Sequence, residues 1–265
     1  MTQPFGLIAL DLDHTLLQDD GTISPYTKAV LTRCKNAGIA ITLATGRMYC
    51  SALPFAQQLQ LDIPLITYQG ALVKYVDGRT ISHYPLANDL ARDVIACLQA
   101  MHMPINLYER DQLYLTHFNE LTLRYAENIK VKPLPWPDDL SHTNPTKLVV
   151  LAEPEAIQTS MMILTEQFGS QINLTRSSET FLEISHPLAT KGTALNQMIQ
   201  RLGITKEQVI AIGDNYNDMD MIEWAGCGVA MGNAIPPLKP LADFVTEDNN
   251  HDGVGKALAR LVLGE

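Results

Sequence analysis

Three short apolar runs, each ending directly at a polar or acidic residue, most constrain what this chain can fold into. They occupy residues 6–10, 39–44 and 209–213, and each is followed by a segment with helical periodicity. Apolar runs between helices are typical of parallel strands covered on both faces. The pattern predicts an α/β fold with a doubly wound parallel sheet, whose polar strand ends lie where such sheets bind ligands.

The character of the chain changes between residues 86 and 188. Helical patterns over 87–101, 118–128 and 154–168 alternate with half-exposed strand patterns, and the Pro-rich segment 132–146 separates two halves. The strand patterns are INLYE, QLYLT, KLVVLA, QINLT and TFLEIS. We expect a small α+β domain at 86–188, inserted into a Rossmann-like core made of residues 1–85 and 189–265.

The remaining elements of the core follow from the same patterns. Residues 64–68 are expected to form a third core strand, and Asp77-Gly78 between two alternating segments predicts a β-hairpin. After residue 190 we expect helices over 192–202, up to 225 and over 254–263, with short strands near 227–230 and 243–246.

Composition excludes several classes of function. The chain has 265 residues and a formal net charge of −10, so it lacks the positive surface of a nucleic-acid or anionic-membrane binder. Its four cysteines form no C-x-x-C pair, so neither a disulfide framework nor a zinc knuckle is indicated. No basic segment precedes the first apolar run, and no apolar stretch approaches the ~18 residues of a membrane span. We expect a cytoplasmic protein.

Acidic residues follow two of the apolar runs. Asp11 and Asp13 lie on one side of an extended segment and repel each other unless a cation such as Mg²⁺ joins them. Taken alone, this pair is equally compatible with a solvated acidic turn. Asp214 follows a second strand, and Asp218 is expected on the same face of the following helix, with Asn217 beside it. Two acidic strand ends favour a metal site.

Two further segments offer groups for an anion. Thr45-Gly46-Arg47 ends a strand and opens a helix, where a hydroxyl and backbone N–H groups can bind an oxyanion. Lys191 opens another helix and offers a point charge. Each signal is weak by itself, but together with the acidic strand ends they predict a Mg²⁺-phosphate site.

The segments DLDHT, ATGR, ATKGTAL and GDNYND, in this order, resemble the four motifs of the haloacid dehalogenase superfamily of phosphotransferases. The insert between the second and third motifs resembles the class II cap, B subtype, of the Cof-like sugar-phosphate phosphatases. GVAMGNA and DNNHDGVGKAL near the C-terminus are similar to the same subfamily.

The resemblance implies a role for each motif residue. Asp11 would be the nucleophile that forms an aspartyl-phosphate, and Asp13 the general acid and base. Mg²⁺ would be held by the Asp11 carboxylate, the Asp13 backbone carbonyl and the Asp214 carboxylate, while Asp218 would support these ligands or bind through water. The phosphoryl oxygens would be held by Thr45, the N–H groups of Leu12 and Gly46, Lys191 and Asn217.

The chain departs from the family pattern at two positions. His14 stands where Gly is usual, either as a contact to substrate or as a tolerated loop residue, and Gln69 stands where Asn is frequent. Arg47 either contacts substrate or pairs with an acid. In the inserted domain, Tyr108, Lys147, Arg176 and Glu183 are candidates for cap contacts with the substrate, although a structural role is equally open to each.

The expected activity is Mg²⁺-dependent hydrolysis of small phosphorylated metabolites, with a sugar phosphate as the leading substrate class. The cap would close over the substrate and exclude water. Two alternatives remain open: a phosphomutase or phosphotransferase that passes the phosphoryl group to another sugar, and a non-catalytic protein that binds phosphorylated metabolites. Neither a nucleic acid nor a membrane is expected as a partner.

Overall fold

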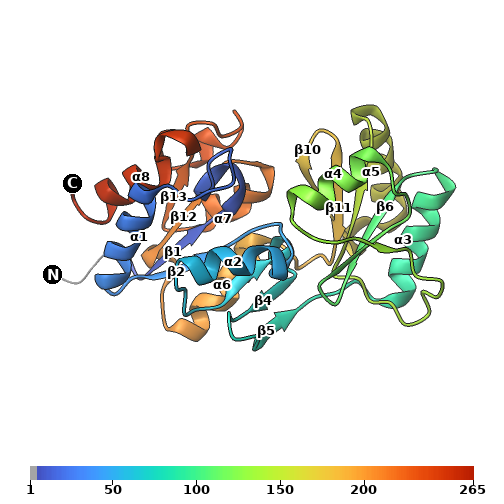
Figure 1. Ribbon diagram of the computed structural model, residues 1–265, viewed down its shortest axis with the longest axis horizontal. Coiled ribbons are helices and arrows are strands. Elements are labelled where there is room, and N and C mark those ends of the chain that lie inside the picture. The colour runs from blue at the N-terminus through green and yellow to red at the C-terminus, as the bar shows by residue number, and fades with distance from the viewer. Residues whose placement is uncertain (1–4) are drawn as a thin grey trace.

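The computed structural model describes residues 5–265, with the side chains of all but Ser177 and Ser178. Figure 1 shows two halves side by side, each built around its own sheet. The half that holds the C-terminus contains the parallel sheet, and the chain from α3 to β11 forms the other half. Across residues 5–265, no helix is both long enough and apolar enough to cross a membrane.

A five-stranded parallel sheet forms the centre of the first half, in the order β14-β13-β12-β1-β2. Its strands are β1 (Leu7–Leu10), β2 (Ala40–Leu43), β12 (Val209–Gly213), β13 (Cys227–Ala230) and β14 (Phe244–Val245). Every side chain of β1 and β12 is buried, as expected for strands covered on both faces. The predicted doubly wound α/β core is thereby confirmed.

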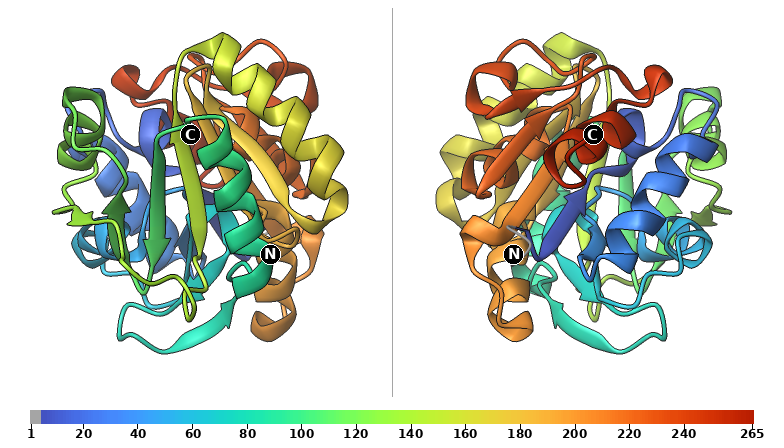
Figure 2. Two further views of the ribbon diagram at one scale, coloured as in Figure 1. Left: turned by 90° about the vertical axis from the view of Figure 1, so that its right-hand side faces the viewer. Right: turned by 90° about the vertical axis from the view of Figure 1, so that its left-hand side faces the viewer.

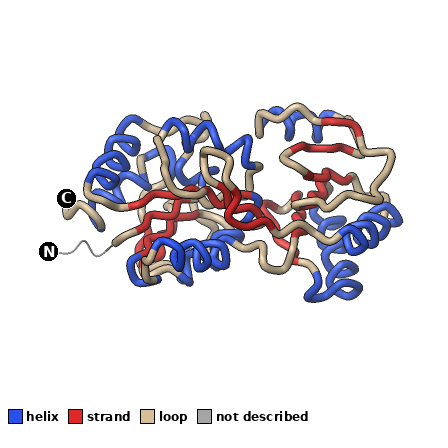
Figure 3. Tube along the Cα trace, turned by 90° about the horizontal axis from the view of Figure 1, so that it is seen from below, coloured by secondary structure: helices blue, strands red, loops and turns tan. Residues whose placement is uncertain are grey.

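Helices cover both faces of this sheet, as Figure 3 shows. They are α1 (Pro25–Asn36), α2 (Tyr49–Gln58), α6 (Lys191–Leu202), α7 (Met219–Trp224) and α8 (Gly253–Leu261). Local sequence explains where they begin: Ser24 caps α1 by accepting the Thr27 N–H, and Pro25 takes the first position, where no amide donor is needed.

The expected third core strand differs in its pairing. β3 (Leu65–Thr67) pairs antiparallel with β4 (Leu72–Lys74), which pairs with β5 (Thr80–His83) across the predicted hairpin turn. β3 joins the parallel sheet through a single parallel bridge between Ala44 and Ile66. The strand prediction was right, and its parallel pairing is limited to this one bridge, because the neighbouring strand β4 supplies the main partner of β3.

A six-stranded sheet forms the second half, in the order β10-β11-β9-β6-β7-β8. Its strands are β6 (Ile105–Glu109), β7 (Gln112–Leu115), β8 (Leu134–Pro135), β9 (Lys147–Leu151), β10 (Asn173–Ser178) and β11 (Phe181–Ser185). Its helices are α3 (Asn88–Ala100), α4 (Glu120–Asn128) and α5 (Pro154–Phe168). The Pro-rich segment 132–146 is not only a separator, because it contributes β8, which pairs parallel with β7.

Alternation along the strands gives this second sheet two different faces. Leu107, Leu148 and Ile184 pack with residues of α3 and α5 in one apolar cluster, and Figure 2 (left) shows both helices lying across the sheet. Their neighbours on the opposite face, among them Val149 and Leu151, belong to the apolar cluster of the parallel-sheet half. The second sheet therefore caps the first half. The domain limits at 85/86 and 188/189 stay a prediction.

Candidate active site

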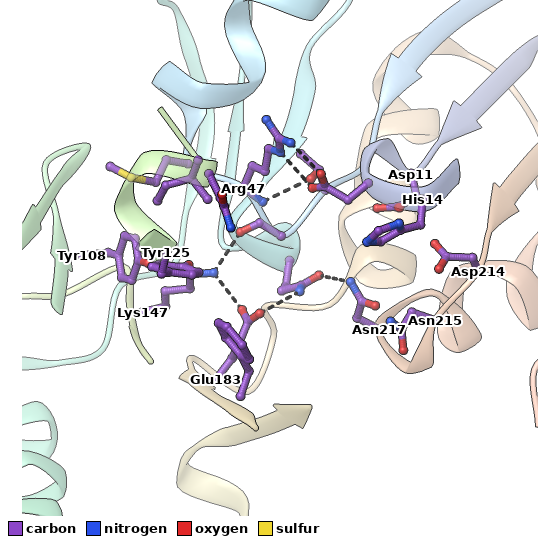
Figure 4. Close-up of a pocket in the computed structure, with 18 residues that line it drawn as sticks. Asp11, His14, Arg47, Tyr108, Tyr125, Lys147, Glu183, Asp214, Asn215 and Asn217 are labelled. Atoms are coloured by element: carbon purple, nitrogen blue, oxygen red, sulfur yellow. Dashed lines mark hydrogen bonds and ion pairs between the residues drawn. The ribbon is translucent and has the colours of Figure 1, made fainter. Parts of the chain in front are cut away.

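A cavity of about 290 Å³ lies between the carboxyl ends of the parallel strands and the cap sheet. Figure 4 shows side chains from both halves pointing into it. Its lining consists of Asp11, Asp13, His14, Thr45, Gly46, Arg47, Met48, Gln69, Tyr108, Tyr125, Asn128, Ile129, Lys147, Phe181, Glu183, Asp214, Asn215 and Asn217. Such a position, at the strand ends of a doubly wound sheet, is where this architecture binds ligands.

Three carboxylates from two distant parts of the chain meet beside the cavity, and two of them, Asp11 and Asp214, line it. β1 and β12 are neighbours in register, and the Asp11 N–H donates to the Ile212 carbonyl at 2.9 Å. Asp11 and Asp214, the residues that follow the two strands, are therefore brought together. One carboxylate oxygen from each of Asp11, Asp214 and Asp218 lies within 4.8 Å of the others. The predicted convergence of two acidic strand ends is present.

Lys191 lies behind this cluster, at the first position of α6, with its side chain completely buried. Its Nζ donates to Asp11 Oδ1 and to Asp218 Oδ1, both at 2.5 Å. Burial alone would lower the pKa of Lys191, but the two carboxylates outweigh burial and raise it. Lys191 therefore carries a positive charge directly beside Asp11.

The carboxylates hold more negative charge than Lys191 neutralises. Burial raises the pKa of Asp11 well above its usual range, and the neighbouring charges of Asp218 and Asp214 add to the effect. Burial, followed by Asp218, raises the pKa of Asp214 to about 7, although the Thr15 hydroxyl donates to Asp214 at 2.8 Å and opposes the shift. A divalent cation with oxygen ligands would relieve this repulsion, so the donor set fits such an ion.

Asp218 reaches the cluster in a different way from the one predicted. It does not share a helix face with Asp214, because α7 begins only at Met219 and a short turn, Tyr216–Asp218, precedes it. Asp218 Oδ2 instead accepts the N–H groups of Asp214 and Asn215 at 2.9 and 3.0 Å. Because its other oxygen accepts from Lys191, Asp218 orients the cluster from behind.

Arg47 pairs with Asp13, which is one of its two predicted roles, and it also lines the cavity, so a contact to substrate stays a prediction. Its Nε and Nη2 donate to the two oxygens of the Asp13 carboxylate at 2.8 and 2.5 Å, a bidentate contact that sets the orientation of the carboxylate. The Arg47 N–H donates to the Thr45 hydroxyl at 3.1 Å, so the turn after β2 positions the guanidinium. Figure 4 shows Arg47 among the side chains that line the cavity.

His14 occupies a backbone position that favours glycine. Its φ is 57°, in the left-handed region, which glycine adopts without steric cost. Histidine can also adopt this conformation, but with some backbone strain. The ring is about two-thirds exposed, and its Nδ1 lies 3.7 Å from Asp19 Oδ1. His14 also lines the cavity, so the structure leaves both predicted roles in place.

The predicted phosphate-binding residues surround the acidic cluster. Thr45, Gly46 and Asn217 line the cavity, whereas the Leu12 side chain is fully buried, so Leu12 can contribute only through its backbone. The Asn217 amide donates to Gln69 Oε1 at 3.0 Å. A Cβ on Gly46 would lie 2.4 Å from Gln69 Nε2, so this glycine is what allows Gln69 to approach.

The cap contributes a buried ion pair to the cavity wall. Lys147 Nζ lies 2.8 Å from Glu183 Oε2 and also donates to the Gly46 carbonyl at 2.9 Å, which joins cap and core. Burial alone would lower the pKa of Lys147, but Glu183 reverses the effect and raises it. The Tyr108 hydroxyl donates to the Tyr125 hydroxyl at 2.6 Å. Three of the four cap candidates thus line the cavity.

Arg176, the fourth candidate, does not line this cavity, and its Nη2 lies 3.5 Å from the Glu179 carbonyl. Of the two roles open to Arg176, the structure therefore favours the structural one, and Arg176 lies on β10, an edge strand of the cap sheet. The sequence analysis names neither Tyr125 nor Asn128, and it includes Phe181 only within the strand pattern TFLEIS; all three line the cap wall. Helical or strand periodicity marks such residues only as buried, so no sequence signal separates them from packing residues.

Comparison with known proteins agrees with this geometry. The family model of haloacid dehalogenase-like hydrolases matches residues 8–258. The 5-amino-6-(5-phospho-D-ribitylamino)uracil phosphatase YitU of Bacillus subtilis is 32% identical, over 97% of each chain. The pyridoxal phosphate phosphatase YbhA of Escherichia coli is 29% identical, over 94% of this chain and 96% of its own.

A solved structure shows the same architecture. The subclass IIB sugar phosphatase BT4131 superposes with a TM-score of 0.84 at 22% identity, over 96% of this chain and 98% of its own, a likeness of fold. The chain belongs to the haloacid dehalogenase-like hydrolases and is a phosphatase of that family.

Proposed function

We propose that this phosphatase hydrolyses small phosphate monoesters, sugar phosphates in particular, through an aspartyl-phosphate formed on Asp11 with Mg²⁺ as its cofactor. The observation that carries the proposal is the contact of Asp11 with Lys191 beside Asp214, at the floor of a cavity closed by the cap. A buried carboxylate held by an ammonium group is oriented for attack and cannot drift into solvent.

The first chemical step uses the carboxylates of Asp11 and Asp13. Asp11 Oδ1 is held by Lys191, so Oδ2 would attack phosphorus while the bond from phosphorus to the ester oxygen breaks. Asp13 would give a proton to the departing oxygen and release the alcohol, and for this its carboxyl group must take up a proton and leave the bidentate contact with Arg47.

The second step regenerates the enzyme. Asp13 would take a proton from a water molecule, whose oxygen attacks phosphorus and breaks the bond to Asp11 Oδ2, leaving inorganic phosphate. Mg²⁺, held by the carboxylates of Asp11 and Asp214 and the Asp13 backbone carbonyl, would offset the repulsion between nucleophile and phosphate. Asp218 would support Lys191 and Asp214 throughout.

The phosphoryl oxygens would be held by donors around the acidic cluster. The Thr45 hydroxyl, the N–H groups of Leu12 and Gly46, the Asn217 amide and Lys191 supply both neutral and charged donors. These groups come from four separate segments, so the correct fold assembles them before any substrate binds. Preorganised donors of this kind stabilise charge that develops during transfer.

The cap wall favours an uncharged, hydroxylated leaving group. Lys147 and Glu183 neutralise each other at 2.8 Å, so a second phosphate on the substrate would have to break a buried ion pair. Hydroxyl groups can donate to Glu183 or accept from Lys147 without that cost. The rings of Tyr125 and Phe181, 5.4 Å apart, offer an apolar surface for the carbon skeleton. A monophosphate is therefore expected to be preferred over a bisphosphate.

The experiment is phosphate release from a panel of hexose and pentose monophosphates and the matching bisphosphates, with Mg²⁺ and with EDTA. We expect release only with Mg²⁺, and loss of at least about 10³-fold in kcat in Asp11→Asn, which removes the nucleophile. Asp20→Asn is the control, because Asp20 is exposed and accepts from Thr22 within its own turn.

Two results would contradict the proposal. Turnover that survives in Asp11→Asn at the level of the unaltered enzyme would exclude Asp11 as the nucleophile. Movement of the phosphoryl group between sugars without free phosphate, followed by ³¹P NMR, would favour a mutase or transferase.

A further inference from the structure

The tip of the β6–β7 hairpin carries two residues in an unfavourable backbone conformation. Glu109 pairs with Gln112, so Arg110 and Asp111 form a two-residue turn, with φ of 48° and 60°. Such turns favour Asn and Gly, because other residues pay a steric cost at positive φ. Neither residue is glycine, and the turn places the Asp111 side chain against the parallel-sheet half, where it contacts Cys50 and Tyr68.

Asp111 caps a helix of the other half. Its Oδ2 accepts the N–H of Cys50 in the first turn of α2 at 2.9 Å, and its Oδ1 accepts the Tyr68 hydroxyl at 2.7 Å. Met48, at the position that normally supplies the cap, makes no side-chain capping bond. A carboxylate from the cap therefore takes the place of the missing capping residue, at the end of the helix that favours negative charge.

Tyr68 connects this contact to the cavity. Tyr68 and Gln69 both have positive φ, 52° and 58°, and their N–H groups donate to the carbonyls of Arg47 and Thr45 at 2.9 and 3.0 Å. The Tyr68 ring also lies edge-on to Tyr108 of the cap, with centroids 6.1 Å apart. The strained Tyr68–Gln69 segment is thus held between the turn after β2 and the cap.

Gln69 carries the connection to the phosphate-binding end of the cavity. Its Oε1 accepts the Asn217 amide at 3.0 Å, and its Nε2 lies 3.4 Å from Glu183 Oε1. In Figure 4, dashed lines mark this link between Glu183 and Asn217. A continuous path of contacts therefore runs from the cap hairpin to an amide beside the acidic cluster.

We propose that Asp111 is a positioning residue: by docking on the Cys50 N–H and the Tyr68 hydroxyl, it holds Tyr68 and Gln69, and through them Asn217, in place for the substrate phosphate. Docking of the cap thereby completes the phosphate site. The proposal rests on the proposed phosphatase activity, because it concerns how that site is assembled.

The first test measures kcat, KM and thermal midpoint for Asp111→Ala, Asp111→Asn and Tyr68→Phe with p-nitrophenyl phosphate and a hexose monophosphate. Loss of two hydrogen bonds is expected to lower kcat/KM about tenfold in Asp111→Ala and less in Tyr68→Phe. Asp111→Asn retains an acceptor oxygen and recovers part of the loss. Asp139→Ala is the control. Asp139 lies in an exposed turn of the cap domain and accepts hydrogen bonds from the N–H and hydroxyl of Ser141, so its loss should leave kcat/KM unchanged.

The second test distinguishes positioning from a general effect on stability. Because Asp111 acts through Asn217, Asp111→Ala should lower kcat/KM much less in an Asn217→Ala background than in the unaltered enzyme. If the two effects multiply instead, or if Asp111→Ala stays within twofold of the unaltered enzyme, the positioning role is wrong. If Asp111→Ala does not fold, Tyr68→Phe replaces it in the same cycle. Absence of hydrolysis in the unaltered enzyme would instead contradict the proposed function.

Discussion

Asp11 and Asp13 are two residues apart, but their carboxylates differ in exposure and in the cation that holds them. The Asp13 side chain is about half exposed and held by the Arg47 guanidinium, whereas Asp11 is buried and held by Lys191. In the proposed mechanism, exposure would let Asp13 exchange protons with substrate and water, while burial keeps Asp11 in one orientation. The alternation of side chains along an extended segment predicts one common face, and the different partners come from other parts of the chain.

The raised pKa of Asp214 makes a prediction about stability and pH. A carboxyl whose pKa rises from 3.8 to about 7 on folding binds protons better in the folded state, so its contribution is lost as pH rises toward 7. Asp214→Asn removes this titration. In EDTA, the Tm of the variant relative to the unaltered protein should therefore increase between pH 5 and pH 8.

Mg²⁺ supplies the complementary measurement for Asp214. An ion that binds only the folded state raises Tm, so Mg²⁺ should stabilise the unaltered protein at pH 8 and have a smaller effect on Asp214→Asn. A Tm difference that does not change with pH would mean that Asp214 is not a protonated, repelled carboxyl in the metal-free protein.

At the scale of elements, the loop after β3 lies in close contact with the start of α6. Gly70 has φ of 102°, and a Cβ there would lie 2.3 Å from the Thr190 carbonyl oxygen, a backbone atom next to Lys191. Gly78, in the hairpin turn, has φ of 94° and open space around it. A substitution at Gly78 therefore tests the cost of a positive φ alone, and a substitution at Gly70 tests the same cost together with that of close packing.

Alanine at these two positions should have unequal effects. Gly78→Ala costs about 1–2 kcal/mol of backbone strain, whereas Gly70→Ala adds a clash that the backbone must relieve at roughly 1–3 kcal/mol more. With about 2–4 °C per kcal/mol for a chain of this size, Tm should fall distinctly further in Gly70→Ala. Gly70→Ala should also lower kcat, because Lys191 moves with Thr190. Equal Tm values for Gly70→Ala and Gly78→Ala would show that the backbone at the start of α6 shifts to accept the added Cβ without a measurable loss of stability.

The elements themselves were predicted closely where local pattern decides them. The helix over 154–168 and the strand over 227–230 match the structure to the residue, because periodicity and the flanking residues define both ends. The antiparallel pairing of β3 and the contribution of β8 were not predicted. Strand pairing depends on which partner lies nearest in space, and a local pattern contains no such information.

For the whole molecule, the buried pair of Lys147 and Glu183 joins the cap to the parallel-sheet half. Both side chains are nearly inaccessible, and Lys147 also donates to the Gly46 carbonyl. Removing one partner leaves an unpaired buried charge, which costs about 3–5 kcal/mol, whereas replacing both by apolar residues of similar volume is often neutral.

Three variants test this pair. Lys147→Met and Glu183→Leu should each lower Tm strongly, and the double variant should recover most of that loss. Activity should not recover in the double variant, because the polar groups that we propose to contact the leaving group are gone. Thermal melts and kcat/KM for a hexose monophosphate measure both quantities. Recovery of activity together with stability would show that the pair serves only folding.

The sequence by itself determined the α/β core, the inserted cap and the residues of the acidic cluster, because short-range periodicity and strand ends encode them. Only the tertiary structure decided that Asp218 turns back onto Lys191, that Arg47 pairs with Asp13 and that Lys147 meets Gly46. Each of these contacts joins residues from different loops or from the two halves. Which polar groups satisfy one another across a closed cavity depends on packing in three dimensions, and a one-dimensional pattern of residue types does not contain it.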